Sequence, residues 1–99
     1  MAKKRETIFI EKVDKQLKAV FGKSLWLENI QQVTKSGTPD RLICINGFFV
    51  GLEVKTDKGE PSKIQLLKLA KIKRAGGLAY IVTPSNWLLV IEELKEICC

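Results

Sequence analysis

The sequence predicts one domain over residues 1–99, of the α/β class and more strictly an α+β fold. Helices should flank a mixed sheet in the order α-β-β-β-α-β-α. Two observations predict the sheet. The first is a pair of apolar runs separated by Asn46-Gly47, the strongest short-range signal for a β-hairpin. The second is a strand-helix-strand succession over residues 48–83, which is typical of a right-handed parallel crossover.

The first helix is expected from about Glu6 to Phe21, with Gly22 ending it in the position that favours glycine. Its apolar stripe consists of Ile10, Val13, Leu17 and Phe21, widened by Phe9 and Val20. Glu6 continues this stripe by one turn, whereas Glu11 lies about 200° around the axis from Val13. Two explanations of Glu6 stay open: a functional carboxylate on the buried stripe, or a first-turn acid that suits the helix dipole.

A first strand is expected over residues 25–33. One parity carries Leu25, Leu27 and Val33, and the other carries Trp26, Glu28 and Ile30. A polar loop follows up to Pro39. Proline is tolerated at the threshold of a strand but not inside its ladder, so Pro39 marks the entry to the next strand.

The hairpin should pair strand 40–45 with strand 48–55. In a two-residue type I′ turn both central residues take positive φ, so Ile45 pairs with Phe48. Five residues further along each strand, Asp40 lies opposite Glu53. Alternation then places on one face Asp40, Leu42, Cys44, Phe49, Gly51, Glu53 and Lys55.

The opposition of Asp40 and Glu53 needs an explanation. Opposed residues in an antiparallel pair lie about 4.5–5.5 Å apart, and like charges there destabilise the sheet. A cation between the carboxylates would remove the repulsion. It is either Lys55, on the same face, or a divalent metal of the kind that binds carboxylates, water and phosphates. The alternative is a solvated edge at which both carboxylates turn into water.

A turn at residues 57–61 precedes the second helix, which is expected over 62–75 and ends at Gly76-Gly77. Ser62 and Gln65 have the spacing of a capping box. The expected interior face is Ile64, Leu67, Leu69, Ala70 and Ile72. The basic residues are Lys63, Lys68, Lys71, Lys73 and Arg74. These basic residues form either a solvated face or a stripe that follows phosphates.

A buried strand is expected over residues 78–83, and Pro84-Ser85 opens a last helix. One face of this helix comprises Trp87, Ile91, Leu94 and Cys98. Trp87 is therefore predicted to be a core residue rather than a platform for base stacking.

The composition limits the chemistry. The chain has no histidine, which excludes histidine general bases, Ser-His and Cys-His nucleophile pairs and most zinc sites. Its net charge of +6 suits a polyanionic partner, although solubility alone would also account for it. Three cysteines, with Cys44 predicted to be a small buried residue, favour a reducing cytoplasm. We expect neither a membrane span nor a signal peptide.

Pro39-Asp40, followed after a gap by Glu53-Val54-Lys55, resembles the PD-(D/E)xK nuclease signature. The surroundings make the resemblance more specific, because together they resemble the VRR-NUC branch of that superfamily and its small stand-alone members from phages and prophages. The matching stretches are 37–40, 51–56, 62–65 and 75–77, within a resemblance that runs from about residue 6 to residue 87.

The resemblance implies a restriction-endonuclease-like core and a metal-dependent endonuclease in the cytoplasm of a bacterial host. Asp40 and Glu53 would hold Mg²⁺ or Mn²⁺, with the Val54 carbonyl as a further ligand. A helical glutamate near the metal, matched by Glu6, would support them. Lys55 would orient or deprotonate the attacking water. Of the remaining family positions, the resemblance places Gln65 beside the scissile phosphate, whereas the capping box is a complete structural explanation of it.

Stand-alone members of the family resemble dimeric enzymes that act on branched DNA, such as four-way (Holliday) junctions. The resemblance therefore implies a homodimer with DNA as its partner. Two alternatives stay open: a non-catalytic nucleic-acid-binding module that kept the fold, and a restriction-like nuclease that acts on plain duplex. Intact Asp40, Glu53 and Lys55 argue against the first alternative.

Overall fold

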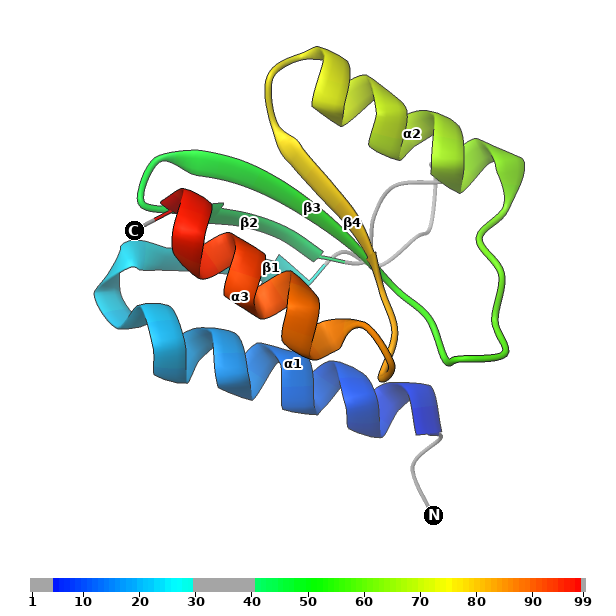
Figure 1. The fold of residues 1–99 in the computed structure, drawn as a ribbon, viewed down its shortest axis with the longest axis horizontal. Helices are drawn as coiled ribbons and strands as arrows, with labels where there is room; N and C mark the ends of the chain where they lie inside the picture. The colour runs from blue at the N-terminus through cyan, green and yellow to red at the C-terminus, as the bar shows by residue number, and fades with distance from the viewer. Residues whose placement is uncertain (1–4, 30–40, 99) are drawn as a thin grey trace.

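A computed structural model describes residues 5–29 and 41–98. The elements follow the predicted order (Figure 1). They are α1 (Arg5–Phe21), the short 3-10 turn η1 (Gly22–Ser24), β1 (Leu25–Asn29), β2 (Arg41–Ile45), β3 (Phe48–Val54), α2 (Lys63–Arg74), β4 (Leu78–Val82) and α3 (Trp87–Cys98).

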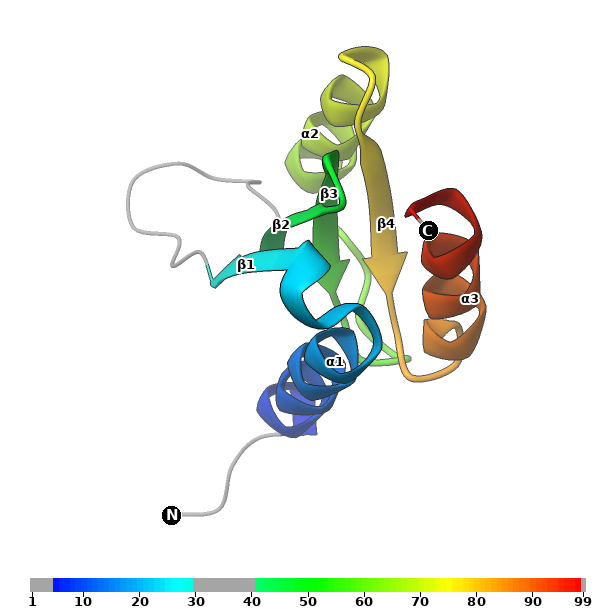
Figure 2. The same cartoon turned by 90° about the vertical axis from the view of Figure 1, so that its left-hand side faces the viewer.

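The four strands form one mixed sheet in the order β1-β2-β3-β4. The first three strands are antiparallel, and β4 lies parallel to β3 after the crossover through α2. Helices α1 and α3 pack on one face of the sheet, and α2 covers part of the other (Figure 2). The predicted fold class and the parallel crossover are confirmed.

The hairpin has the predicted turn and register. Asn46 and Gly47 have φ angles of 51° and 90°, as a type I′ turn requires. Ile45 pairs with Phe48, and the last described pair joins Arg41 to Leu52. The next position along β2 is Asp40, which lies outside the described residues, so its opposition to Glu53 stays a prediction.

The core lies between the sheet and the two helices α1 and α3. It combines Phe9, Val13, Leu17 and Phe21 of α1, Ile43, Ile45, Val50, Leu52, Val54 and Val82 of the sheet, and Trp87, Val90, Ile91, Leu94 and Cys98 of α3. The predicted faces of the two helices are therefore largely confirmed, and Trp87 is a core residue with 2% exposure. Val20 was wrongly assigned to the stripe, because it lies at the margin of the buried face and is 40% exposed.

The predicted interior face of α2 is wrong at Ile64, Leu67 and Ala70 and right at Leu69. Ile64 and Leu67 are 50% and 55% exposed, Ala70 is exposed as well, and Leu69 is the buried residue of the helix. The helix carries apolar side chains on several sides, so periodicity alone does not decide its orientation. In the structure Gln65 and Leu69 face the sheet, one turn apart, because Gln65 hydrogen-bonds a buried strand residue.

Two strand predictions also need correction. Strand β4 is only partly buried: Ala79 and Val82 are covered, whereas the side chains between them are half-buried. Cys44 is half-buried rather than buried, because it lies on the sheet face where α2 gives only partial cover. None of the helices in the described ranges is both long and apolar enough to cross a membrane.

Candidate active site

Glu53 is the carboxylate around which the site is built. It lies near the end of β3, where Val50, Leu52 and Val54 point into the core and the intervening residues face α2. Alternation thus directs Glu53 away from the core but beneath the start of α2, and its exposure is only 2%. Burial of a carboxylate is expensive unless donors or cations compensate it, so its contacts are informative.

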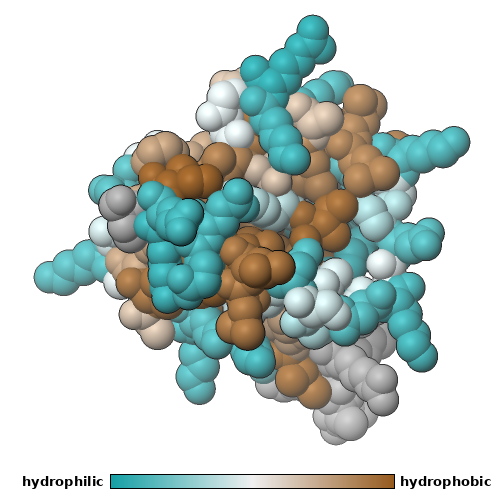
Figure 3. Space-filling model, in the orientation of Figure 1, coloured by the Kyte–Doolittle hydropathy of each residue, from teal (hydrophilic) through white to brown (hydrophobic). Residues whose placement is uncertain are grey.

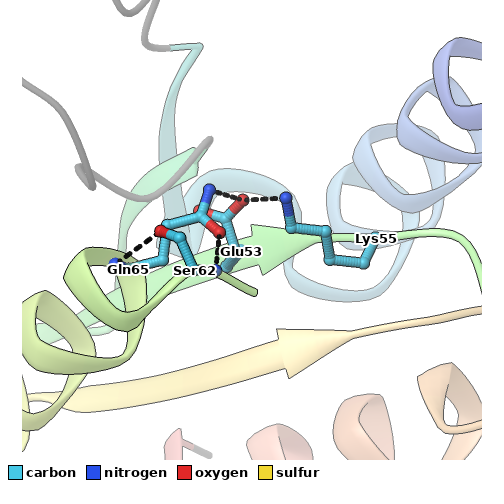
Figure 4. Close-up of polar contacts among 4 residues, drawn as sticks. All are labelled: Glu53, Lys55, Ser62 and Gln65. Atoms are coloured by element: carbon cyan, nitrogen blue, oxygen red, sulfur yellow. Dashed lines mark hydrogen bonds and ion pairs between the residues drawn. The ribbon is translucent and has the colours of Figure 1, made fainter. Parts of the chain in front are cut away.

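The first compensating group is the side-chain amide of Gln65, whose Nε2 donates to Glu53 Oε2 at 2.9 Å (Figure 4). The other end of the same amide serves the predicted capping box. Gln65 Oε1 accepts from the Ser62 backbone N–H at 2.8 Å, and the Ser62 Oγ accepts from the Gln65 N–H at 3.1 Å. The capping box is confirmed, and it holds Gln65 in the orientation that reaches Glu53.

The second compensating group is Lys55, whose Nζ lies 3.5 Å from the same Oε2 atom (Figure 4). The Lys55 backbone N–H donates to the Val82 carbonyl at 2.9 Å, which extends the parallel ladder beyond β3. This bond fixes the start of the side chain beside Glu53. The Lys55 side chain is 21% exposed, so an ammonium with three donors can contact both Glu53 and a group arriving from solvent.

The site therefore brings together three of the predicted residues: Glu53, Lys55 and Gln65. Lys55, one of the two cations considered as compensation for the carboxylates, lies beside Glu53. Val54 is buried at the end of β3 and pairs with Val82, and its carbonyl stays a predicted ligand.

The remaining predicted ligands lie beyond what the structure describes. Asp40 falls outside the described residues, and Glu6 belongs to α1 but its side chain is not among those described. Glu11, the alternative to Glu6, is exposed. In the described ranges, no three acidic, cysteine or histidine side chains come together as a metal site. The described residues supply the Glu53 carboxylate and the Val54 carbonyl, and both are oxygen donors of the kind that Mg²⁺ prefers.

An ion pair that the sequence reasoning missed supports the opposite face of the sheet. Arg41 Nε and Nη2 donate to the two Asp14 carboxylate oxygens at 2.9 and 3.1 Å, and Arg41 is 4% exposed. Its parity with the core residues Ile43 and Ile45 is the signal that could have revealed it. The pair joins β2 to α1.

A second missed contact joins the loops that follow β3 and β4. Asp57 Oδ1 accepts from the Ser85 Oγ at 2.6 Å and from the Ser85 backbone N–H at 3.1 Å. These hydrogen bonds from Ser85 lower the pKa of the Asp57 carboxyl below its usual value. The contact tethers the loop after Lys55 to the start of α3.

Comparisons with known proteins bear on the fold. No protein-family model matches the sequence, and neither does any curated protein. A solved structure described as "VRR_NUC domain" is similar, with a TM-score of 0.64 and 22% sequence identity over 88% of this chain and 94% of that one. The chain has the fold of a VRR_NUC domain. This likeness confirms the restriction-endonuclease-like architecture, because it covers nearly the whole of both chains. At 22% identity it is a likeness of fold, and the roles of individual residues stay predictions.

Proposed function

We propose that the protein is a metal-dependent endonuclease that hydrolyses phosphodiester bonds in DNA. The observation that carries the proposal is the convergence of Lys55 and Gln65 on one oxygen of the buried Glu53 carboxylate. A carboxylate and an amine in this arrangement, within a VRR_NUC fold, are suited to phosphoryl chemistry. Histidine and a nucleophilic serine are not needed for it.

Glu53 and Asp40 would hold Mg²⁺ or Mn²⁺, with the Val54 carbonyl as a further ligand and Glu6 in support. The oxygen donors present at Glu53 and Val54 fit such an ion. A divalent ion supplies Lewis-acid stabilisation of the phosphoryl charge and makes water a stronger acid. The protein itself contributes fixed geometry. Gln65 holds the Glu53 carboxylate, and the β3–β4 ladder positions Lys55 through its backbone N–H.

Lys55 contributes positive charge where negative charge develops on the phosphate. Its ammonium group has donors to spare beyond Glu53, so it can bind a phosphate oxygen or orient the attacking water. Gln65 keeps Glu53 Oε2 occupied by an amide N–H, which restricts the rotation of the carboxylate. Gln65 is thus a positioning residue in this proposal, and a direct contact with the phosphate stays a prediction from the resemblance.

The substrate we propose is branched DNA, such as a four-way junction, and the active form is a homodimer. A net charge of +6 suits a partner that carries many phosphates. Two symmetric active sites are the natural way for a chain of 99 residues to nick two strands. The closely related possibility of cleavage on plain duplex is an outcome of the same experiment.

Purified protein should be incubated with Mg²⁺, Mn²⁺, Ca²⁺ or chelator on a four-way junction, a flap, a duplex and a single strand of matched sequence. We expect cleavage with Mg²⁺ or Mn²⁺ and not with Ca²⁺, whose looser coordination positions water poorly. The branched substrates should be cut fastest. Cleavage in excess chelator would rule out the metal mechanism, equal rates on every duplex would favour the restriction-like alternative, and binding without cleavage would favour the non-catalytic module.

A further inference from the structure

A groove of about 620 Å³ lies on the same sheet face as Glu53, at the opposite end of β3. The tip of the β2–β3 hairpin forms one wall, and the second half of α2 forms the other. Gly77 belongs to the groove lining, and a Cβ at this position would lie 2.9 Å from Ile72 Cγ2 and 3.2 Å from Phe49 Cδ1. This close packing ties the hairpin to the end of α2, so both walls belong to the folded framework.

Aromatic side chains on this face are exposed to solvent. Phe49 lies on this face, lines the groove and is 47% exposed, and Phe48, which has the opposite parity, lines the groove at the tip of the hairpin. Phe49 pairs with Cys44, which in turn pairs with Trp26 on β1, and Trp26 is 57% exposed. The register therefore places Trp26 and Phe49 in one row across the sheet, about 10 Å apart. Aromatic side chains exposed on a sheet are a known platform for unpaired bases.

The charged residues of the groove are positive. Lys68 and Lys71 line it from successive turns of α2, and its lining has no acidic residue among those described. Neither lysine side chain makes an ion pair or hydrogen bond with another described residue. Glu28 lies on the same sheet face, but on β1 and outside the groove lining. The charge thus suits a negatively charged occupant running along α2.

The position of the groove relates it to the proposed site. Phe49 and Glu53 face the same side of β3 and are four residues apart, which corresponds to about 13 Å. Gly51 lies between them and adds no side chain. A DNA strand leaving Glu53 along this face would reach the groove within a few nucleotides.

We propose that this groove binds unpaired nucleotides of the DNA substrate, with a base stacked on Phe49 and the backbone phosphates on Lys68 and Lys71. The proposal deepens the proposed function and takes DNA as the partner from it. A symmetric contact between the grooves of two copies is less suited, because it would bring two lysine-lined surfaces together. The exposed Leu88 and Leu89 of α3 lie outside the lining of the groove. In the view of Figure 3, the apolar side chains form patches separated by hydrophilic ones.

The test measures binding rather than cleavage. A fluorescent single-stranded oligonucleotide of about ten nucleotides is titrated with the full chain in chelator, and anisotropy reports its affinity. Phe49→Leu keeps an apolar side chain but removes the aromatic face, and it should weaken binding about tenfold. Lys71→Gln should weaken binding and lower the slope of log affinity against log salt by about one. Leu89→Ala and Lys73→Gln, outside the groove, are matched controls and should bind like the parent.

An abasic oligonucleotide of the same length tests stacking without any change to the protein. The parent should bind it about tenfold more weakly than the normal strand, and Phe49→Leu should bind the two strands equally. Equal binding of both strands by the parent, or an unchanged affinity in Phe49→Leu, would overturn the proposal. If sedimentation shows that Phe49→Leu dissociates a dimer while DNA affinity persists, a second copy occupies the groove instead.

The outcome is independent of catalysis. A parent that binds the strand through Phe49 but never cleaves DNA with Mg²⁺ would refute the proposed function and leave this inference standing. A parent that cleaves DNA but binds abasic and normal strands equally would do the reverse.

Discussion

Replacing Gln65 with glutamate separates the two explanations of this residue, a helix cap and a support for the active site. Glutamate is as good as glutamine at this position of a capping box, so the acceptor for the Ser62 N–H is retained. The group that faces Glu53 changes from an amide donor to a carboxylate. Gln65→Glu therefore removes the contact to Glu53 and leaves the cap in place.

The expected magnitude follows from the contact at 2.9 Å between Gln65 Nε2 and Glu53 Oε2. A hydrogen bond to a charged group contributes about 1.5–3 kcal/mol, and the substitution adds repulsion that Lys55 offsets only in part. We expect the free energy of unfolding to fall by about 2–3 kcal/mol at pH 7.5. The matched variant Ser62→Ala removes a cap contact without altering Glu53, and it should lower the free energy by about 1 kcal/mol.

The loss in Gln65→Glu should depend on pH. Two carboxylates at hydrogen-bond distance hold one shared proton in the folded state more tightly than the separate groups do in the unfolded chain. Stability therefore falls, relative to the parent, as pH rises and this proton is lost. Urea unfolding at intervals between pH 4.5 and 8, about the range in which such pairs titrate, should show a difference from the parent that grows with pH.

Cleavage assays complete the test. Loss of an outer contact to a metal ligand typically lowers activity about 10- to 100-fold, so Gln65→Glu should lose that much at pH 7.5. Ser62→Ala should keep most of the activity. Equal stability and activity in Gln65→Glu and the parent would refute the reasoning and reduce Gln65 to a helix cap.

The remaining predictions concern other groups. Lys55→Ala should cut the cleavage rate about 100-fold or more in single-turnover assays while DNA affinity persists, and a rate like that of the parent would make Lys55 a surface charge. Glu6→Gln should lower the activity more than Glu11→Gln does, and the reverse order would reassign the helical carboxylate. Burial of Tyr80 is the main cause that raises its pKa to about 12, and a hydrogen bond from its hydroxyl to a carboxylate of α3 is the second cause. Because the folded state keeps this proton longer than the unfolded chain, the stabilisation is complete below pH 10 and is lost as pH rises toward 12. Thermal melting of Tyr80→Phe should therefore be less sensitive to pH than that of the parent in this range, and parallel curves would contradict the assignment.

Much of the candidate site was predictable because it depends on short-range chemistry. The Asn46-Gly47 turn determines the strand register, and the register determines which residues share a face with Glu53. The capping box likewise needs only two residues three positions apart, and both of its hydrogen bonds are present. These features involve few residues, and their geometry follows from allowed backbone angles and side-chain reach.

The orientation of α2 was not predictable in this way. Its apolar residues lie on several sides, so the period of 3.6 residues favours no single face, and the face with Ile64 and Leu67 was wrongly chosen. In the structure, Gln65 contacts Glu53, and the helix face that carries Gln65 and Leu69 lies toward the sheet. That contact joins two elements across a loop, and sequence periodicity says nothing about which helix covers which part of a sheet.

The sequence by itself determined the order of the elements, the hairpin register and the helix cap, since each follows from interactions between residues near one another in the chain. Only the tertiary structure decided that Gln65 and Lys55 meet on one oxygen of Glu53, and that Arg41 pairs with Asp14 across the core. Such contacts depend on packing between distant segments, where burial makes an uncompensated charge expensive and so selects the partner that can satisfy it.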